Sequence, residues 1–204
     1  SGPFLSNLTG GDNGLSLPYS IGFLPNNNGY TDIGVFATNT ATTTGTIGAS
    51  GGKAHSLQRS DGKYTILHGG DEVTNVYDSS INSFVGGVLP GSAIIGSGSH
   101  SFQRPDGKFL IINANGDKIT TLYNQITNTG IVGPNLIDNT GVGSHSLLRP
   151  DGKFLIIEGN STASTSVYDP IANTMATGTP LTATAGAGAH SILRPDGKFL
   201  IVSG

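Results

Sequence analysis

The stretch HSLLRPDGKFLII, residues 145–157, occurs in four related copies along this chain of 204 residues. The other copies are HSLQRSDGKYTIL from His55, HSFQRPDGKFLII from His100 and HSILRPDGKFLIV from His190, so the copies recur every 45 residues. A fixed period of about 20–50 residues is typical of repeat proteins, in which each repeat folds as one supersecondary unit. The spacing therefore predicts a repeat protein.

Each repeat is predicted to form four short strands. In the copy from His145, the Asp-Gly pair at residues 151–152 predicts a hairpin turn, because Gly tolerates a positive φ and Asp caps the turn. Residues 154–157 form an unbroken apolar run, which indicates a strand buried on both faces. Residues 165–168 and 173–176 predict a third and a fourth strand. Four short strands in each period, with no helical pattern, predict an all-β fold: a β-propeller of four-stranded blades.

The repeat resembles a kelch repeat, especially the bacterial kind found in galactose-oxidase-like propellers. The resemblance lies in the order His-Ser, Asp-Gly-Lys with an apolar strand, Val-Tyr-Asp-Pro and Asn-Thr, and it covers residues 55–204. Two features depart from the kelch pattern. The double glycine after the second strand survives only at Gly69-Gly70, and the Trp typical of the fourth strand is missing.

The repeats divide the chain into a series of predicted blades. We expect an N-terminal segment, 1–54, with degenerate or closing blade strands, then blades at 55–99, 100–144 and 145–189, and the first half of a further blade at 190–204.

The ends of the chain allow three interpretations. Residues 30–45 resemble third and fourth strands that could close a ring. Alternatively, a degenerate blade begins near Tyr19 with a turn at residues 27–29. In the third interpretation, a longer chain or a second chain completes the ring. We expect a partial propeller that is an ordered portion of a larger protein.

Composition excludes several classes of function. The chain has no Cys, which excludes disulfides, thiol catalysis and Cys-bound metals. Eight of the ten Lys and Arg residues lie inside the repeated motif, so no basic face for nucleic acid is expected. No apolar stretch approaches the ~18 residues of a membrane helix, so no membrane insertion is expected. The weakly charged, Thr-, Ser-, Asn- and Gly-rich composition favours a secreted, extracellular or cell-surface protein of bacterial or viral origin.

Two polar positions recur in every copy and are the candidate binding residues. They are His55, His100, His145 and His190, and Arg59, Arg104, Arg149 and Arg194. The histidines could line a channel for an anion, a metal or a sugar, or could bond to the backbone of a neighbouring blade. The arginines could recognise carboxylates or phosphates, or could pack between blades and pair with the Asp of the turn. Because both positions are copied in every repeat, we favour the structural interpretation for each.

Enzyme chemistry finds little support in the sequence. A galactose-oxidase-like copper site would need a Cys-linked Tyr, and the chain has no Cys. His68, Asn113 and Glu158 occupy one equivalent position, where variation could mark a ligand-contacting rim, although drift is the favoured explanation. We therefore expect no catalytic residues, no metal and no cofactor, and lean towards a protein that is not an enzyme.

The favoured function is a non-catalytic propeller module, for binding or structure, of an exported or cell-surface protein. Its expected partners are other proteins or copies of itself, recruited through exposed strand edges, with glycans as a further class. One alternative is a carbohydrate-binding, lectin-like propeller. Another is the propeller domain of a larger secreted oxidase or epimerase whose catalytic residues lie outside this chain. A viral or phage surface fibre is a third.

Overall fold

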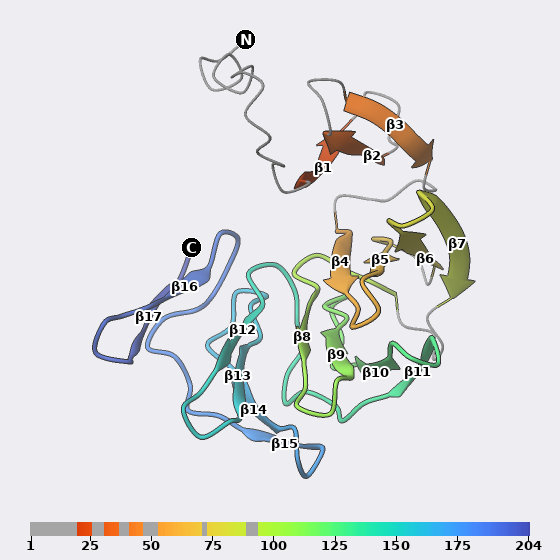
Figure 1. The fold of residues 1–204 in the computed structure, drawn as a ribbon. Coiled ribbons are helices and arrows are strands. Elements are labelled where there is room, and N and C mark those ends of the chain that lie inside the picture. Colours follow the sequence, from red (N-terminus) through yellow and green to blue (C-terminus); the bar gives the residue numbers. More distant parts are fainter. Residues whose placement is uncertain (1–19, 26–30, 37–40, 47–52, 71–72, 89–93) are drawn as a thin grey trace. The chain divides into compact units, whose positions relative to one another are not determined.

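A computed structural model describes residues 20–25, 31–36, 41–46, 53–70, 73–88 and 94–204. The chain divides into two compact units, Ser1–Ala49 and Ser50–Gly204. Every regular element in the described ranges is a β-strand, which confirms the prediction of an all-β fold (Figure 1). Within these ranges there is no helix long and apolar enough to cross a membrane.

The first unit contains one three-stranded antiparallel sheet. Its strands are β1 (Ser20–Pro25), β2 (Thr31–Phe36) and β3 (Ala41–Thr46), with β2 in the centre. Pairing between β2 and β3 is irregular between Asp32 and Gly34. Tyr19 and the turn expected at residues 27–29 lie outside the described residues, so the role of this segment as a degenerate or closing blade stays a prediction.

The second unit contains three four-stranded antiparallel sheets and one two-stranded sheet. In each four-stranded sheet the strands lie side by side in chain order (Figure 1). Such sheets resemble the blades of a β-propeller. The strands of the β4–β7 sheet are β4 (His55–Gln58), β5 (Tyr64–Leu67), β6 (Val73–Asp78) and β7 (Ser83–Val88). Those of the β8–β11 sheet are β8 (His100–Gln103), β9 (Phe109–Ile112), β10 (Thr120–Asn124) and β11 (Thr129–Val132). Those of the β12–β15 sheet are β12 (His145–Leu148), β13 (Phe154–Ile157), β14 (Thr165–Asp169) and β15 (Thr174–Thr177). The two-stranded sheet contains β16 (His190–Leu193) and β17 (Phe199–Val202).

The Asp-Gly pairs make the hairpin turns that the sequence predicts. At the β12–β13 turn, Gly152 has a φ of 78° and its N–H donates to the Arg149 carbonyl at 3.0 Å. The Asp151 carboxylate caps the turn by accepting from the Lys153 N–H at 3.2 Å. Only Gly adopts such a φ without steric cost, which explains why the turn keeps Gly in every copy.

The fourth strand of the β12–β15 sheet begins one residue later than the sequence predicted. Asn173, expected as its first residue, is a turn residue with a φ of 54°, and Asn82 and Asn128 are the equivalent turn residues of the other two four-stranded sheets, with φ of 52° and 55°. Asn tolerates this left-handed conformation better than most residues. Its side-chain oxygen accepts a hydrogen bond from the hydroxyl of the third-strand Tyr, as from Tyr168 to Asn173 at 2.8 Å. The Asn therefore fixes the turn instead of pairing in the strand.

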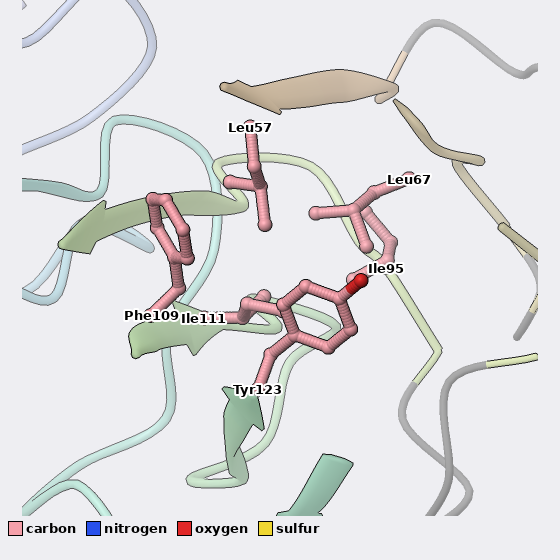
Figure 2. Packing of buried hydrophobic residues seen from close by; sticks show 6 residues of the cluster. All are labelled: Leu57, Leu67, Ile95, Phe109, Ile111 and Tyr123. Atoms are coloured by element: carbon pink, nitrogen blue, oxygen red, sulfur yellow. The ribbon is translucent and has the colours of Figure 1, made fainter. Parts of the chain in front are cut away.

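The core lies where neighbouring sheets pack face to face. All four side chains of β9 are buried, as its unbroken apolar run predicts. Figure 2 shows one cluster of buried residues from the β4–β7 and β8–β11 sheets and the segment between them. Its members are Leu57, Leu67, Ile95, Phe109, Ile111 and Tyr123. The Tyr123 hydroxyl also lies 3.0 Å from Oγ1 of Thr65, so the one polar end in this cluster is satisfied.

A second cluster joins the β8–β11 and β12–β15 sheets. It contains Leu110, Ile112, Leu136, Phe154, Ile156 and Tyr168, with Phe102 and Met175 packed against it. The rings of Phe102 and Phe154 are stacked with centroids 4.0 Å apart. Phe102 stands in β8 where Leu57 stands in β4, so the same position of the repeat covers the next sheet at both junctions.

Strand β17 differs from the other second strands because it is only half buried. Its residues alternate between intermediate and exposed, whereas β9 is buried throughout. Leu200 and Val202 are the exposed pair. No other sheet of the described chain covers the face of β17 that carries Leu200 and Val202. An unbroken apolar run therefore leads to burial on both faces only where a sheet packs on each side.

Truncation of a core side chain should be far more costly than truncation of an equally large exposed one. Ile156 is fully buried in β13, and Ile171 is 84% exposed in the β14–β15 turn. Ile156→Ala should lower the free energy of unfolding by about 2–5 kcal/mol, since it removes apolar contacts and leaves a cavity. Ile171→Ala should change it by about 0.5 kcal/mol or less. Urea unfolding of both variants tests this, and equal losses would contradict the packing described.

Candidate functional site

The repeated histidines bridge neighbouring sheets. His100 donates from Nδ1 to the Gly98 carbonyl at 2.9 Å, and its Nε2 lies 2.6 Å from Oγ of Ser146 in the next sheet. His145 repeats the arrangement with Gly143 at 2.8 Å and Ser191 at 2.6 Å. A carbonyl can only accept, so Nδ1 carries the proton and Nε2 accepts from the serine hydroxyl. We call this pair of bonds the His–Ser clasp.

Each clasp depends on a glycine two residues before the histidine. Gly98, Gly143 and Gly188 have φ of 85–93°, a range that residues with a Cβ rarely adopt. A Cβ on Gly143 would lie 2.0 Å from the Gly186 carbonyl oxygen, so the backbones approach too closely for any side chain. His190 keeps the bond to its glycine, with Nδ1 2.9 Å from the Gly188 carbonyl.

His55 does not form the clasp. Lys53 stands where the other repeats have Gly, and its φ is not positive. The Ser99 hydroxyl donates to the Lys53 carbonyl at 3.1 Å and lies 3.3 Å from Nδ1 of His55. Nε2 of His55 is buried without a hydrogen-bond partner. Ser101, the counterpart of Ser146, is therefore not engaged by the histidine before it.

Burial determines the charge of two of these histidines. Desolvation lowers the pKa of His55 to about 4, with a further contribution from the nearby His100. Desolvation also lowers the pKa of His100 to about 4, although its bond to Gly98 acts in the opposite direction. Both rings are therefore neutral at pH 7, and in His100 the acceptor role of Nε2 in the clasp requires a neutral ring.

Each repeated arginine forms an ion pair with the Asp of its own turn. Four such pairs occur in the described chain: Arg59–Asp61, Arg104–Asp106, Arg149–Asp151 and Arg194–Asp196, with N–O distances of 2.9–3.2 Å. The structure thus places each arginine beside a carboxylate of its own repeat. The four arginines do not converge on a common ligand position.

Arg104 makes additional contacts with the next sheet. Nη1 donates to Oδ1 of Asn173 at 2.8 Å, and Nη2 donates to the Pro170 carbonyl at 2.9 Å. The guanidinium carbon lies 5.7 Å from the centroid of the Tyr168 ring. Its side chain is 8% exposed, against 40% for Arg149. Arg104 therefore joins two sheets, whereas Arg149 pairs only with its own turn.

The position after each second strand varies between repeats, and it is buried after β5, β9 and β13 and half-buried after β17. His68 lies 2.6 Å from Oδ1 of Asn75, and Asn113 accepts from the Thr121 hydroxyl at 3.3 Å. Glu158 accepts from the Ser166 hydroxyl and from the backbone N–H groups of residues 137 and 138. Burial raises the pKa of the Glu158 carboxyl, whose second oxygen is buried without a partner. These side chains are tied to their own sheets or to the preceding connection, so they do not form an exposed rim.

A crevice of about 420 Å³ lies between the first strands β4 and β8 and the turn after β4. Six polar residues line it: Ser56, Gln58, Arg59, Ser60, Ser101 and Gln103. Leu57, Phe102 and Phe109 supply its apolar part. The sequence offered one signal for it, since Gln58 and Gln103 stand where the later repeats have Leu148 and Leu193.

The comparisons support the fold and leave the family open. No family model matches the chain, and no curated protein matches it. Among solved structures, the chain is similar to a fungal alcohol oxidase of the AA5 family in complex with copper, at 14% identity and a TM-score of 0.51. The similarity covers 86% of this chain and 56% of the oxidase chain, so this chain spans little more than half the length of that enzyme. At this identity the likeness shows the fold alone.

The described residues do not fit a copper site. They contain no group of three or more His, Asp or Glu side chains placed to hold a metal ion. His100 and His145 use both ring nitrogens in the clasp.

Arg104 and Arg149 form a matched pair for mutation. Arg104→Ala should lower the free energy of unfolding by about 2–3 kcal/mol, because it leaves the buried Pro170 carbonyl without its donor and removes the bond to Asn173 in the next sheet. Arg149→Ala should lower it by at most ~1 kcal/mol, because that side chain is largely exposed and makes a surface ion pair. Thermal unfolding of the two variants measures the difference. A larger loss for Arg149→Ala would show that Arg104 does not join the sheets.

Stability should fall on acidification before most carboxylates titrate. The folded-state pKa of His100 is about 4 and its ordinary value is 6.5, so the unfolded chain binds a proton first as the pH falls. The neutral ring therefore favours folding fully above pH 6.5, and this contribution is lost progressively as the pH approaches 4. Melting temperatures between pH 4 and 8 test this expectation. In His100→Gln, whose amide oxygen can still accept from Ser146, the fall between pH 6.5 and 4.5 should be smaller, and an unchanged slope would contradict the assignment.

Proposed function

We propose that this chain is a non-catalytic β-propeller module of an exported or cell-surface protein, and that it associates with copies of itself or with other proteins through a strand edge. The observation that carries the proposal is the outer edge of the four-stranded sheets. Strands β7, β11 and β15 each pair on one side only within the described chain, whereas β5, β9 and β13 are each paired on both sides. An unpaired edge presents N–H and C=O groups to which another strand can pair.

The side chains beside that edge strengthen the proposal. Ile131 is 62% exposed and Val132 is 60% exposed on β11, and Val85 is 64% exposed on β7. Apolar side chains beside an open edge favour association, because pairing then removes apolar surface from water as well as satisfying the backbone. The clasps of His100 and His145 and the contacts of Arg104 support the same class of function, since these bonds hold sheets together.

Self-association gives a direct test. The 204-residue chain, 20.7 kDa, should form dimers or larger assemblies by native mass spectrometry and light scattering at micromolar concentration. The double variant Val85→Lys with Ile131→Lys should be a 20.7 kDa monomer, since lysines on an edge strand oppose pairing. Ile171→Lys, a substitution of an exposed residue in the β14–β15 turn, serves as the control and should assemble like the parent. A parent chain that is monomeric at every concentration and captures no partner strand would overturn the proposal.

A second candidate is the propeller domain of a larger oxidase, and the similarity to the fungal alcohol oxidase favours it. Under this proposal the catalytic residues lie outside the 204 residues. The mass of the chain isolated from its natural source distinguishes the two candidates. A chain much heavier than 20.7 kDa that consumes dioxygen with alcohols would support the oxidase, and a chain of 20.7 kDa would exclude it.

A further inference from the structure

We infer that the crevice between β4 and β8 is a binding site for a neutral, hydroxyl-rich small molecule of monosaccharide to disaccharide size. This inference goes beyond the proposed function and does not depend on it. The crevice volume of about 420 Å³ lies in the range of about 300–1,000 Å³ that is typical of small-molecule sites. This junction differs from the β8–β12 junction in its lining side chains and in its hydrogen bonds.

The first difference is in the side chains at the opening of the crevice. Gln58 ends β4 and Gln103 ends β8, and both are exposed. At the β8–β12 junction, Leu148 takes the place of Gln103, and Pro105 takes the place of Ser60. An amide side chain both donates and accepts hydrogen bonds, and so does a serine hydroxyl. The first junction therefore carries a set of donors and acceptors that the second junction lacks.

The second difference is the open clasp. Ser146 is engaged by His100, so its hydroxyl is committed to the protein. At the first junction His55 is turned towards Ser99, and Nε2 of His55 is left buried without a partner. Ser101 makes no side-chain hydrogen bond within the described chain, and it lines the crevice. The substitution of Gly by Lys53 thus frees one hydroxyl that the other junctions use for structure.

The charge of the crevice points to a neutral ligand. Arg59 is its one charged lining residue, and the Asp61 carboxylate accepts from Nε at 3.2 Å and from Nη2 at 3.0 Å. The positive charge is therefore offset within the turn, which leaves Nη1 as a donor. An anion would gain little here, whereas hydroxyl groups match the amides and serines in both roles. The half-buried Phe102 is the apolar lining residue that suits the C–H face of a sugar ring, since Leu57 and Phe109 belong to the core cluster.

The repeats themselves supply variants that should fold. Gln58→Leu with Gln103→Leu installs the residue that Leu148 and Leu193 already place at this position. Binding is measured by isothermal titration and by chemical shifts of the Gln side-chain amides, with glucose, galactose, mannose, cellobiose and lactose as probes. At least one of these sugars should bind the parent chain, and the double variant should bind it about tenfold more weakly, since it removes the hydrogen bonds of two amide side chains. Ser101→Ala should weaken it severalfold.

Leu148→Gln is the matched control, because it alters the equivalent position of the next junction and should leave affinity unchanged. Inorganic phosphate is the charged probe and should bind more weakly than the sugar. Absence of binding for all five sugars at millimolar concentration would overturn the inference. Equal binding by the Gln58→Leu with Gln103→Leu variant, or tighter binding of phosphate, would do the same. Assembly is measured separately, so these outcomes do not bear on the proposed association.

Discussion

Burial of the second strand between two neighbouring sheets is the constraint on which the rest of the structure depends. In each four-stranded sheet the second strand is apolar on both faces, and the other strands of the same sheet lie beside it and cover neither face. Ile111 and Ile112 follow each other in β9 and belong to different clusters, one towards the preceding sheet and one towards the next. Each repeat therefore becomes stable only when it is stacked, as is general for repeat architectures.

The polar residues of the repeat complement this packing at the sheet margins. The clasp fixes the first strands to each other, and Arg104 fixes the turn after β8 to the turn after β14. These bonds are directional, whereas apolar packing is not. The apolar clusters thus supply most of the stabilisation, and the polar bonds set the position of one sheet against the next.

The sequence predicted the strands and turns well because the repeat shows each of them several times. The unbroken run at residues 154–157 and the Asp-Gly pairs were sufficient for two strands and a turn. The partner of His100 was not predicted: the expected bond was to the backbone of a neighbouring blade, and Nε2 instead meets a serine side chain. The signal was present, since His and Ser are copied together in every repeat. The crevice was missed because its residues come from two repeats, and no single motif contains them.

The clasp also gives the stack a direction. Every repeat presents a histidine at one side and a serine at the other, so the contact is heterologous, and any two successive copies can join in only one orientation. Heterologous contacts between like units close into rings when the rotation at each junction divides a full turn, and otherwise continue as an open spiral. A duplicated repeat would already contain both the histidine and the serine of the clasp. The geometry of one junction therefore governs how many repeats can close a ring. Gene duplication can change the number of repeats, because an added repeat uses the contacts that the others already make.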